Sequence, residues 1–343
     1  MQTAVLEAPR RFGVVERPVP AAGDGQVLVR VAATAVCHTD LSIYTGGHPG
    51  VRYPVVLGHE AAGTVHAVGA GVSRTVPGQR VLINPIIACG SCDCCRRGLE
   101  NLCRKAGLLG RELDGSLCGY LCLPERFVYP LPAHLPLEDA TLIETLATVR
   151  HGQARAAIRA GESVAVVGQG AAGLLHTRLA RLAGADPVIA ISRSPWKLDM
   201  ARALGAQRVV RASAQEAVDE VNRITRGSGV DVVVDAAGGA GVFKAALEML
   251  RPGGRLLEFA VDAGAHPDLS MFPVYFKELA IVGSRALLPA DLTAAIAMAA
   301  AGQVDFSGFI TARFPLAETA AAFAEYERNP DSVLRIAIFG EGS

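Results

Sequence analysis

The sequence predicts an α/β protein of two domains, a β-rich, barrel-like domain followed by a doubly wound parallel sheet. At 343 residues, the chain exceeds the ~250 to 300 residues at which single cores stop growing. Its first 150 or so residues contain short apolar runs separated by Pro and Gly, whereas strands and helices alternate from Glu162 onward. A glycine-rich turn at residues 168–173 lies between the first of these strands and its helix.

The composition excludes several classes of partner. Half of the residues are hydrophobic and 19% are charged, which is typical of a soluble globular protein. The 33 Lys and Arg residues equal the 33 Asp and Glu residues, so no net field favours nucleic acid or an anionic membrane. The N-terminus lacks signal-peptide features, and no apolar run reaches the ~18 residues of a membrane span. We therefore expect a cytoplasmic protein that binds neither nucleic acid nor a membrane.

The β-rich region is expected to contain strands at residues 27–32 and 62–69, and a turn at residues 76–81 leads into another strand. In the second region, the pattern predicts helices opening at Ser194-Pro195 and spanning 243–250, and strands at 163–167, 188–191, 230–235, 254–259 and 279–282.

The residues after this second region are too few for a domain. They contain an Ala-rich helix at 291–301 and a strand at 336–339, and we expect them to return to the first domain. The predicted boundaries are therefore 1–149 for the β-rich domain, 150–286 for the parallel-sheet domain, and 287–343 for the segment that completes the first.

Five of the eight cysteines lie within fifteen residues, which in a reducing compartment points to metal or catalysis rather than disulfides. The spacing of Cys89, Cys92, Cys95 and Cys103 matches a closed, four-thiolate structural zinc site. Cys94 is surplus. A redox use of Cys94 and Cys95 is the alternative, although neighbouring cysteines form strained disulfides.

A second set of metal ligands is more scattered. Cys37 offers a thiolate and His59 an imidazole, and Glu144 lies in an apolar run where a carboxylate is costly to bury unless it is paired or bound to metal. Together their charges balance Zn²⁺ and leave a fourth position for water or substrate, as in catalytic sites. Each residue alone is more often a core or hydrogen-bonded group, so this prediction depends on the rest of the chain.

The glycine-rich turn reads Gly168-x-Gly170-x-x-Gly173, with Ala171 and Ala172 between the last two glycines. A strand before this motif and a helix after it are the context that identifies a dinucleotide site. The glycines permit a tight turn and close approach of a pyrophosphate, which faces the helix N-terminus.

The end of the second strand distinguishes the two nicotinamide cofactors. An NAD site usually has Asp or Glu there, but this chain reads Ser192-Arg193-Ser194. Arg193 and Ser194 suit a 2′-phosphate, so NADP is predicted over NAD, with Lys197 as a further cofactor-binding residue. The alternative is that Arg193 is a solvated surface residue and that NAD binds through its 3′-hydroxyl.

With both cysteine patterns and the glycine motif in this order, the chain resembles the zinc-dependent medium-chain alcohol dehydrogenases over essentially its whole length. The resemblance implies a GroES-like catalytic domain and a Rossmann cofactor domain. It also implies that Cys37, His59 and a third Cys, Asp or Glu bind the catalytic zinc. In the same way, Glu60 is a carboxylate that approaches the metal, Asp40 orients the ligand histidine, and Thr39 touches the substrate oxygen.

Glu144 is similar to its counterpart in the polyol and threonine dehydrogenase branch, which usually reads Glu-Pro-Leu, but here Thr145 replaces the proline. This departure leaves open whether Glu144 or Glu60 is the lasting ligand. The histidine that often ends the proton relay falls at Ser42, so the relay ends in Ser42, a cofactor ribose, water or His48.

The sequence therefore predicts an oxidoreductase with two zinc ions per chain, one catalytic and one structural. It would transfer hydride between NADP and a small secondary alcohol or ketone, such as a polyol or sugar-derived substrate. One alternative is an alcohol or aldehyde dehydrogenase acting on small primary alcohols. Another is a non-catalytic zinc- or nucleotide-binding protein, which is disfavoured because no ligand is lost. A homodimer or homotetramer is expected, with residues 279–283 as an exposed sheet edge.

Overall fold

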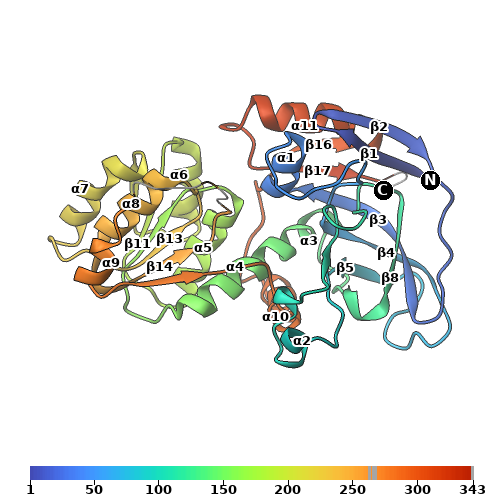
Figure 1. Cartoon of the computed structure of the whole chain (residues 1–343), viewed down its shortest axis with the longest axis horizontal. Coiled ribbons are helices and arrows are strands. Elements are labelled where there is room, and N and C mark those ends of the chain that lie inside the picture. Colours follow the sequence, from blue (N-terminus) through green and yellow to red (C-terminus); the bar gives the residue numbers. More distant parts are fainter. Residues whose placement is uncertain (262–263, 265–268, 341–343) are drawn as a thin grey trace. The chain divides into compact units, whose positions relative to one another are not determined.

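The computed structural model describes residues 1–261, 264 and 269–340. The chain forms two compact units, the first from Met1–Ala147 with Leu287–Ser343 and the second from Thr148–Ala286 (Figure 1). Helix α4 (Leu142–Ala156) begins in the first unit and ends in the second. Among the described residues, no helix is long and apolar enough to cross a membrane.

The first unit is rich in β-structure. Its helices are α1 (His38–Tyr44), α2 (Asp93–Arg96), α3 (Leu137–Ala140), α10 (Pro289–Ala300) and α11 (Thr319–Arg328), with 3-10 turns at Glu100–Leu102, Glu125–Phe127 and Leu316–Glu318. Its strands are β1 (Gln2–Ala8), β2 (Arg11–Glu16), β3 (Gln26–Val36), β4 (Glu60–Val68), β5 (Arg80–Ile83), β6 (Ile86–Ile87), β7 (Gly107–Leu108), β8 (Tyr120–Pro124), β9 (Val128–Pro130), β16 (Ile310–Pro315) and β17 (Arg335–Phe339).

Strand β3 is central to the main sheet of this unit. The strand order is β16-β17-β3-β4-β5-β9, with β8 also paired to β3. Val27, Val29 and Val31 alternate along β3 and are buried in one apolar core. Near its end, β3 pairs with β17, where Ala35 lies opposite Ala337. This pairing and the pairing of residues 33–35 with β4 extend β3 beyond the predicted residues 27–32.

The second unit is a six-stranded parallel sheet. Its strands are β10 (Val164–Val167), β11 (Val188–Ser192), β12 (Arg208–Arg211), β13 (Val230–Asp235), β14 (Leu250–Glu258) and β15 (Ala280–Gly283), in the order β12-β11-β10-β13-β14-β15. Its helices are α5 (Ala171–Leu182), α6 (Pro195–Ala203), α7 (Ala214–Ile224), α8 (Ala240–Met249) and α9 (Phe272–Phe276). This strand order is that of a Rossmann fold, which confirms the predicted fold class. The prediction omits β12, because four residues flanked by arginines give no apolar run.

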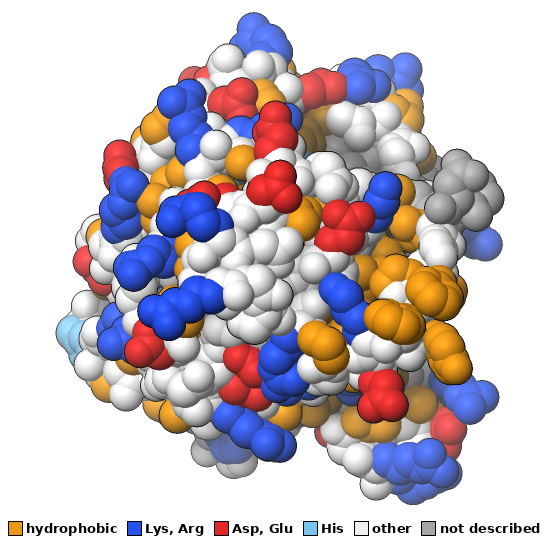
Figure 2. Space-filling view, turned by 90° about the vertical axis from the view of Figure 1, so that its left-hand side faces the viewer, with side chains coloured by type: hydrophobic (Ala, Val, Ile, Leu, Met, Phe, Trp, Pro, Cys, Tyr) orange, Lys and Arg blue, Asp and Glu red, His pale blue; other side chains and the backbone are white. Residues whose placement is uncertain are grey.

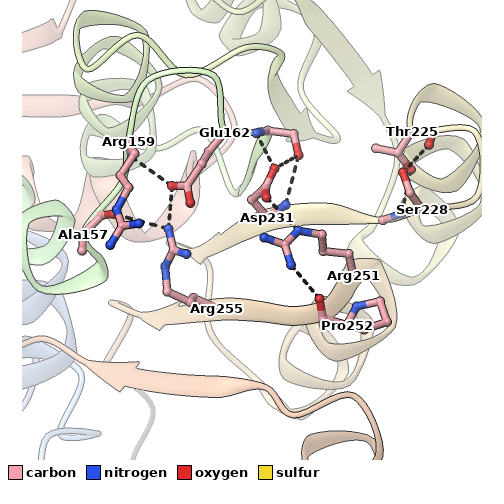
Figure 3. Close-up of polar contacts among 11 residues, drawn as sticks. Ala157, Arg159, Glu162, Thr225, Ser228, Asp231, Arg251, Pro252 and Arg255 are labelled. Carbon is pink, nitrogen blue, oxygen red and sulfur yellow. Dashed lines mark hydrogen bonds and ion pairs between the residues drawn. The ribbon is translucent and has the colours of Figure 1, made fainter.

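The amino ends of these parallel strands are held together by ion pairs (Figure 3). Arg255 Nη2 lies 2.6 Å from Glu162 Oε2, just before β10. Arg251 Nε lies 2.7 Å from Asp231 Oδ1, which joins the starts of β14 and β13. These charged side chains at the amino ends of the strands are therefore paired with one another. The carboxyl ends, where open α/β sheets bind ligands, carry the candidate cofactor residues.

Candidate active site

Cys37, His59 and Glu60 meet because β3 and β4 are antiparallel. Cys37 follows the last residue of β3, His59 precedes β4, and Glu60 begins it opposite Ala35. One ligand atom from each of the three side chains lies within 4.8 Å of the other two. A thiol, an imidazole and a carboxylate in this arrangement form a donor set that suits zinc.

Asp40 fixes the imidazole of this cluster. Its buried carboxylate accepts the backbone N–H groups of Cys37 at 2.9 Å and Gly58 at 3.1 Å, and Oδ1 lies 3.3 Å from His59 Nδ1. Burial alone would raise the pKa of Asp40, but the charge and hydrogen bond of His59 and the two N–H groups lower it overall. With Nδ1 engaged, His59 keeps Nε2 for a metal, which is the usual arrangement of a ligand histidine.

Gly58 permits this local geometry. Its φ of +95° lies in a region that L side chains rarely adopt. A Cβ at this position would also lie 2.7 Å from Ser116 Oγ and 2.8 Å from Thr34 Cγ2. The residue before His59 must therefore be glycine if the imidazole is to enter the cluster.

Glu60 is held by two donors that come from distant parts of the chain. Thr145 Oγ1 donates to Glu60 Oε1 at 2.8 Å, and Arg335 Nη2 donates to the same oxygen at 3.0 Å. Arg335 Nη2 also donates to Thr145 Oγ1 at 3.3 Å. Glu60 Oε2 is buried and has no hydrogen-bond partner among the described residues, as expected of an oxygen that is left for a metal.

Arg335 was missed in the sequence analysis. It opens the apolar strand β17 as its only charged residue and is 5% exposed. A lone arginine at the start of a buried strand is the signal that could have suggested a buried acidic partner. Its partner Glu60 lies 275 residues earlier, so the signal would not have named it.

Glu144 lies near this cluster but is not one of the residues whose ligand atoms all lie within 4.8 Å. It is buried in the first turn of α4. Burial, followed by the charge of Glu60, raises the pKa of Glu144 to about 7. The structure therefore brings Glu60, rather than Glu144, together with Cys37 and His59.

The predicted proton-relay residues occupy the same short segment. Thr39 and Ser42 lie on α1, directly after Cys37, and both side chains are half-buried. His48 follows this helix, and its Nδ1 lies 3.0 Å from the carbonyl oxygen of Pro49. Thr39 is thus close in the chain to the metal-ligand candidate, and His48 already has a local hydrogen-bond partner.

The four cysteines with zinc-site spacing come together around α2. The sulfurs of Cys89, Cys92, Cys95 and Cys103 all lie within 4.8 Å of one another, and neighbouring pairs are 3.5 to 3.9 Å apart. The backbone and side chain of Ser91 donate to the Cys89 sulfur and lower the pKa of Cys89 to about 5. Four convergent sulfurs with N–H donors around them suit a closed thiolate site.

Cys94 lies in α2 between two of these cysteines but is not one of the four clustered sulfurs. All eight cysteines of the chain belong to the described residues, and each is a free thiol. The thiols are therefore available for metal rather than spent in disulfides.

The three motif glycines form the turn between β10 and α5. Gly168 has a φ of +88°, and a Cβ on Gly173 would lie 1.8 Å from the Gly168 carbonyl oxygen. A Cβ on Gly170 would meet nothing within 4 Å, so the turn is open at the N-cap of α5. Gln169 instead folds inward, where its Nε2 donates to Val166 O at 3.0 Å. Ala171 and Ala172 then form the first turn of α5, which suits an anion.

The carboxyl ends of β11 and β12 carry two arginines. Arg193 follows Ser192 at the end of β11, and Arg211 lies opposite Ser192 at the end of β12. Both arginine side chains are exposed. Ser194 caps α6, with its N–H donating to Ser192 Oγ at 3.2 Å. Arg211 was missed in the sequence analysis, because β12 itself was not predicted.

Lys197 contacts an aromatic ring on its own helix. Its Nζ lies 5.3 Å from the centre of the neighbouring Trp196 ring, a cation–π contact within α6. The structure therefore gives Lys197 a local partner close to the predicted cofactor residues.

Comparisons with known proteins identify the class to which this chain belongs. Residues 23–133 match the family described as "Alcohol dehydrogenase GroES-like domain", and residues 171–301 match "Zinc-binding dehydrogenase". Sorbitol dehydrogenase of Bacillus subtilis (strain 168) is 30% identical, over 99% of this chain and 97% of its own length. The chain belongs to the zinc-dependent medium-chain alcohol dehydrogenase family and is an oxidoreductase of that family.

Two further relatives are informative. D-arabitol-phosphate dehydrogenase of Enterococcus avium is 32% identical, over 91% of this chain and 90% of its own length. A solved structure from Sinorhizobium meliloti 1021, bound to NADP, has a TM-score of 0.89 and 31% identity, and the match covers 98% of each chain. These similarities confirm the predicted family. The substrate and cofactor of this chain are inferred below from its own residues.

Proposed function

We propose that this protein is a zinc-dependent oxidoreductase that transfers hydride between NADP(H) and a secondary alcohol or ketone, with a polyol or sugar-derived molecule as its substrate. The observation that carries this proposal is the cluster of Cys37, His59 and Glu60 ligand atoms within 4.8 Å. A zinc ion held there would supply a Lewis acid for the substrate oxygen. The polyol substrates named for two relatives support the substrate class.

The residues around the cluster have separate roles in this proposal. Asp40 orients the His59 ring through its contact with Nδ1, which leaves Nε2 as the nitrogen that faces a metal. Thr39 takes up the proton of the substrate hydroxyl and passes it outward through Ser42, a ribose hydroxyl, water or His48. Hydride moves between the substrate carbon and the nicotinamide ring.

The four clustered thiols are proposed to hold a second zinc that acts only on folding. All four positions are filled by protein sulfurs, so no position is left for substrate. The first unit would then be the catalytic domain and the second the dinucleotide-binding domain, with residues 287–343 completing the former. Two zinc ions per chain are expected.

NADP is proposed as the preferred cofactor because the carboxyl ends of β11 and β12 offer two arginines and no acid. Ser192, Arg193 and Ser194 follow in sequence, and Arg211 lies opposite Ser192. A carboxylate at this place would bind both ribose hydroxyls of NAD, whereas cations and hydroxyls suit a 2′-phosphate. Gly168, Gly170 and Gly173, with the first turn of α5, would hold the pyrophosphate.

Replacing Arg193 by Ala should weaken NADP binding by about 1.5 to 3 kcal/mol, the scale of a hydrogen bond to a charged group, and leave NAD binding nearly unchanged. Ser192→Asp should have the opposite effect, since it adds an acceptor for ribose hydroxyls and a charge that repels phosphate. Arg208→Ala, at the other end of β12, is the matched control. Titration of each variant with both cofactors measures these effects. A higher kcat/KM with NAD than with NADP in the unaltered protein would contradict the assignment.

The reaction is tested by steady-state oxidation and reduction across a panel of polyols, sugars, ketones and small primary alcohols, each with NADP and NAD. We expect the highest kcat/KM for a polyol or its keto form. Turnover confined to small primary alcohols would overturn the substrate class. No turnover with any member, from protein that contains both zinc ions, would favour a non-catalytic binding protein.

A homo-oligomer is proposed because the second unit has an uncovered sheet edge. β15 is the last strand in the order, and within residues 1–261, 264 and 269–340 it pairs only with β14. Helix α9, which precedes it, exposes Phe272, Tyr275 and Phe276 by 63, 81 and 72%. Figure 2 shows hydrophobic side chains gathered on one part of the face that it views. Exposed edges and apolar patches of this kind favour association.

Light scattering at micromolar concentration should therefore give the mass of a dimer or tetramer. Phe276→Asp should reduce that mass, because it places a charge among the exposed aromatic rings. A single-chain mass for the unaltered protein would refute the proposal.

A further inference from the structure

Position 145 brings a hydroxyl group next to the candidate metal cluster. Thr145 is 5% exposed, and its Oγ1 donates to Glu60 Oε1 at 2.8 Å. The same Oγ1 accepts from Arg335 Nη2 at 3.3 Å, and Arg335 Nη2 donates to Glu60 Oε1 at 3.0 Å. The three side chains contact one another in a closed ring. They come from α4, β4 and β17, and all three residues belong to the first unit.

The direction of the Thr145 hydroxyl is unusual for a helical threonine. Such hydroxyls commonly bond to a backbone carbonyl one turn earlier in the chain. Thr141, four residues before, does so and donates to Glu138 O at 2.6 Å. The Thr145 hydroxyl instead donates across the unit to a carboxylate on β4. Its hydrogen bond therefore serves the cluster rather than the helix.

The hydrogen bond from Thr145 affects how the Glu60 carboxylate is oriented. The terminal torsion of a glutamate is broad, so hydrogen bonds decide which oxygen faces which neighbour. Oε1 is occupied by two donors, and the part of the chain that the structure describes gives the buried Oε2 no hydrogen-bond partner. A buried carboxylate oxygen without a donor is costly unless a cation meets it. One carboxylate oxygen of Glu60 belongs to the cluster with Cys37 and His59. Since Oε1 is already occupied by two donors, Oε2 is the oxygen that remains for a metal.

We propose that Thr145 is a positioning residue that holds Glu60, through Oε1, in the orientation that makes it a persistent zinc ligand through Oε2. This inference rests on the proposed function, because it requires zinc at Cys37 and His59. Arg335 supplies charge to the same oxygen, but the hydroxyl supplies the shorter contact and links the arginine to the carboxylate. The proline found at this position in related branches would offer no such donor.

The test is zinc release from the intact protein to a coloured chelator, with zinc counted by elemental analysis. Thr145→Val keeps the shape of the side chain and removes the hydroxyl. We expect one of the two zinc ions to leave about 10 to 100 times faster, the usual effect of losing an outer partner of a metal ligand. Thr145→Ser should restore slow release, and the thiolate-bound zinc serves as the internal reference.

Two controls separate positioning from general damage. Thr141→Val removes a comparably buried hydroxyl between α3 and α4, and should leave both release rates unchanged. In a Glu60→Gln background, Thr145→Val should have no further effect on zinc release, because its action depends on the Glu60 carboxylate. Circular dichroism verifies that each variant is folded.

Unchanged zinc release in Thr145→Val would overturn this inference and leave the proposed function intact. Effects of Thr145→Val and Glu60→Gln that simply add would also overturn it. A single zinc ion in the unaltered protein that is retained in Cys37→Ala would instead refute the proposed function, and this inference with it. These outcomes are distinguished by the same zinc counts.

Discussion

Replacing Arg335 by Met is expected to lower the free energy of unfolding by about 3 to 5 kcal/mol. Arg335 and Glu60 form an ion pair at 3.0 Å, with side chains only 6% and 1% exposed. Removing the cation leaves the Glu60 carboxylate buried with only the Thr145 hydroxyl as a donor. Urea unfolding, followed by circular dichroism and with the metal content held constant, measures this loss.

The double variant Arg335→Met with Glu60→Gln is the control for this prediction. It removes both charges, so it should recover a large part of the lost stability, although the zinc site would remain damaged. Glu327→Gln breaks the exposed ion pair with Arg10 and should cost less than about 1 kcal/mol. A loss below about 1 kcal/mol for Arg335→Met alone would show that the buried pair contributes no more than a surface pair.

Cys103→Ser should have the other large effect, a loss of at least about 5 kcal/mol, since structural zinc contributes ~10 to 16 kcal/mol in small peptide domains. The four sulfurs lie in a segment with a small apolar cluster of its own, so the metal replaces core packing. Thermal unfolding with and without chelator measures the effect.

Cys94→Ser is the matched control for this change. Cys94 lies in the same turn of the chain but is not part of the sulfur cluster, so its loss should be nearly neutral. Cys103→Ser protein that remains folded should keep its turnover, because the four-thiolate site has no open position. A stable but inactive Cys103→Ser variant would contradict this division of roles.

Local patterns predicted the parts of the fold that local residues determine. The strand–glycine turn–helix unit at β10 and α5 follows from residues within one short window, and so does the four-cysteine cluster. The length of β3 does not, because residues 33–35 pair with β4 on one side and residues 33–36 pair with β17, from the end of the chain, on the other. β12 also escaped prediction, since only two valines separate its arginines.

In the candidate site, too, some residues can be predicted from local patterns and others depend on distant contacts. Cys37 and His59 could be proposed from their motifs, whereas the choice between Glu60 and Glu144 required the register of β3 and β4. Apolar neighbours in the sequence favoured Glu144, and the structure places Glu60 in the cluster. Arg335 and the role of the Thr145 hydroxyl depend on contacts across 275 and 85 residues of sequence, which no local pattern contains.

The most direct test of the account is zinc content and hydride transfer, measured together in the unaltered protein and in Cys37→Ala. Elemental analysis should find two zinc ions per unaltered chain and one in Cys37→Ala, with unchanged circular dichroism. Reduction of NADP by the best polyol, followed by absorbance, should fall at least about a thousandfold in the variant, since metal activation supplies several kcal/mol. One zinc or none in the unaltered protein, or a Cys37→Ala variant that keeps two zinc ions or normal turnover, would contradict the account.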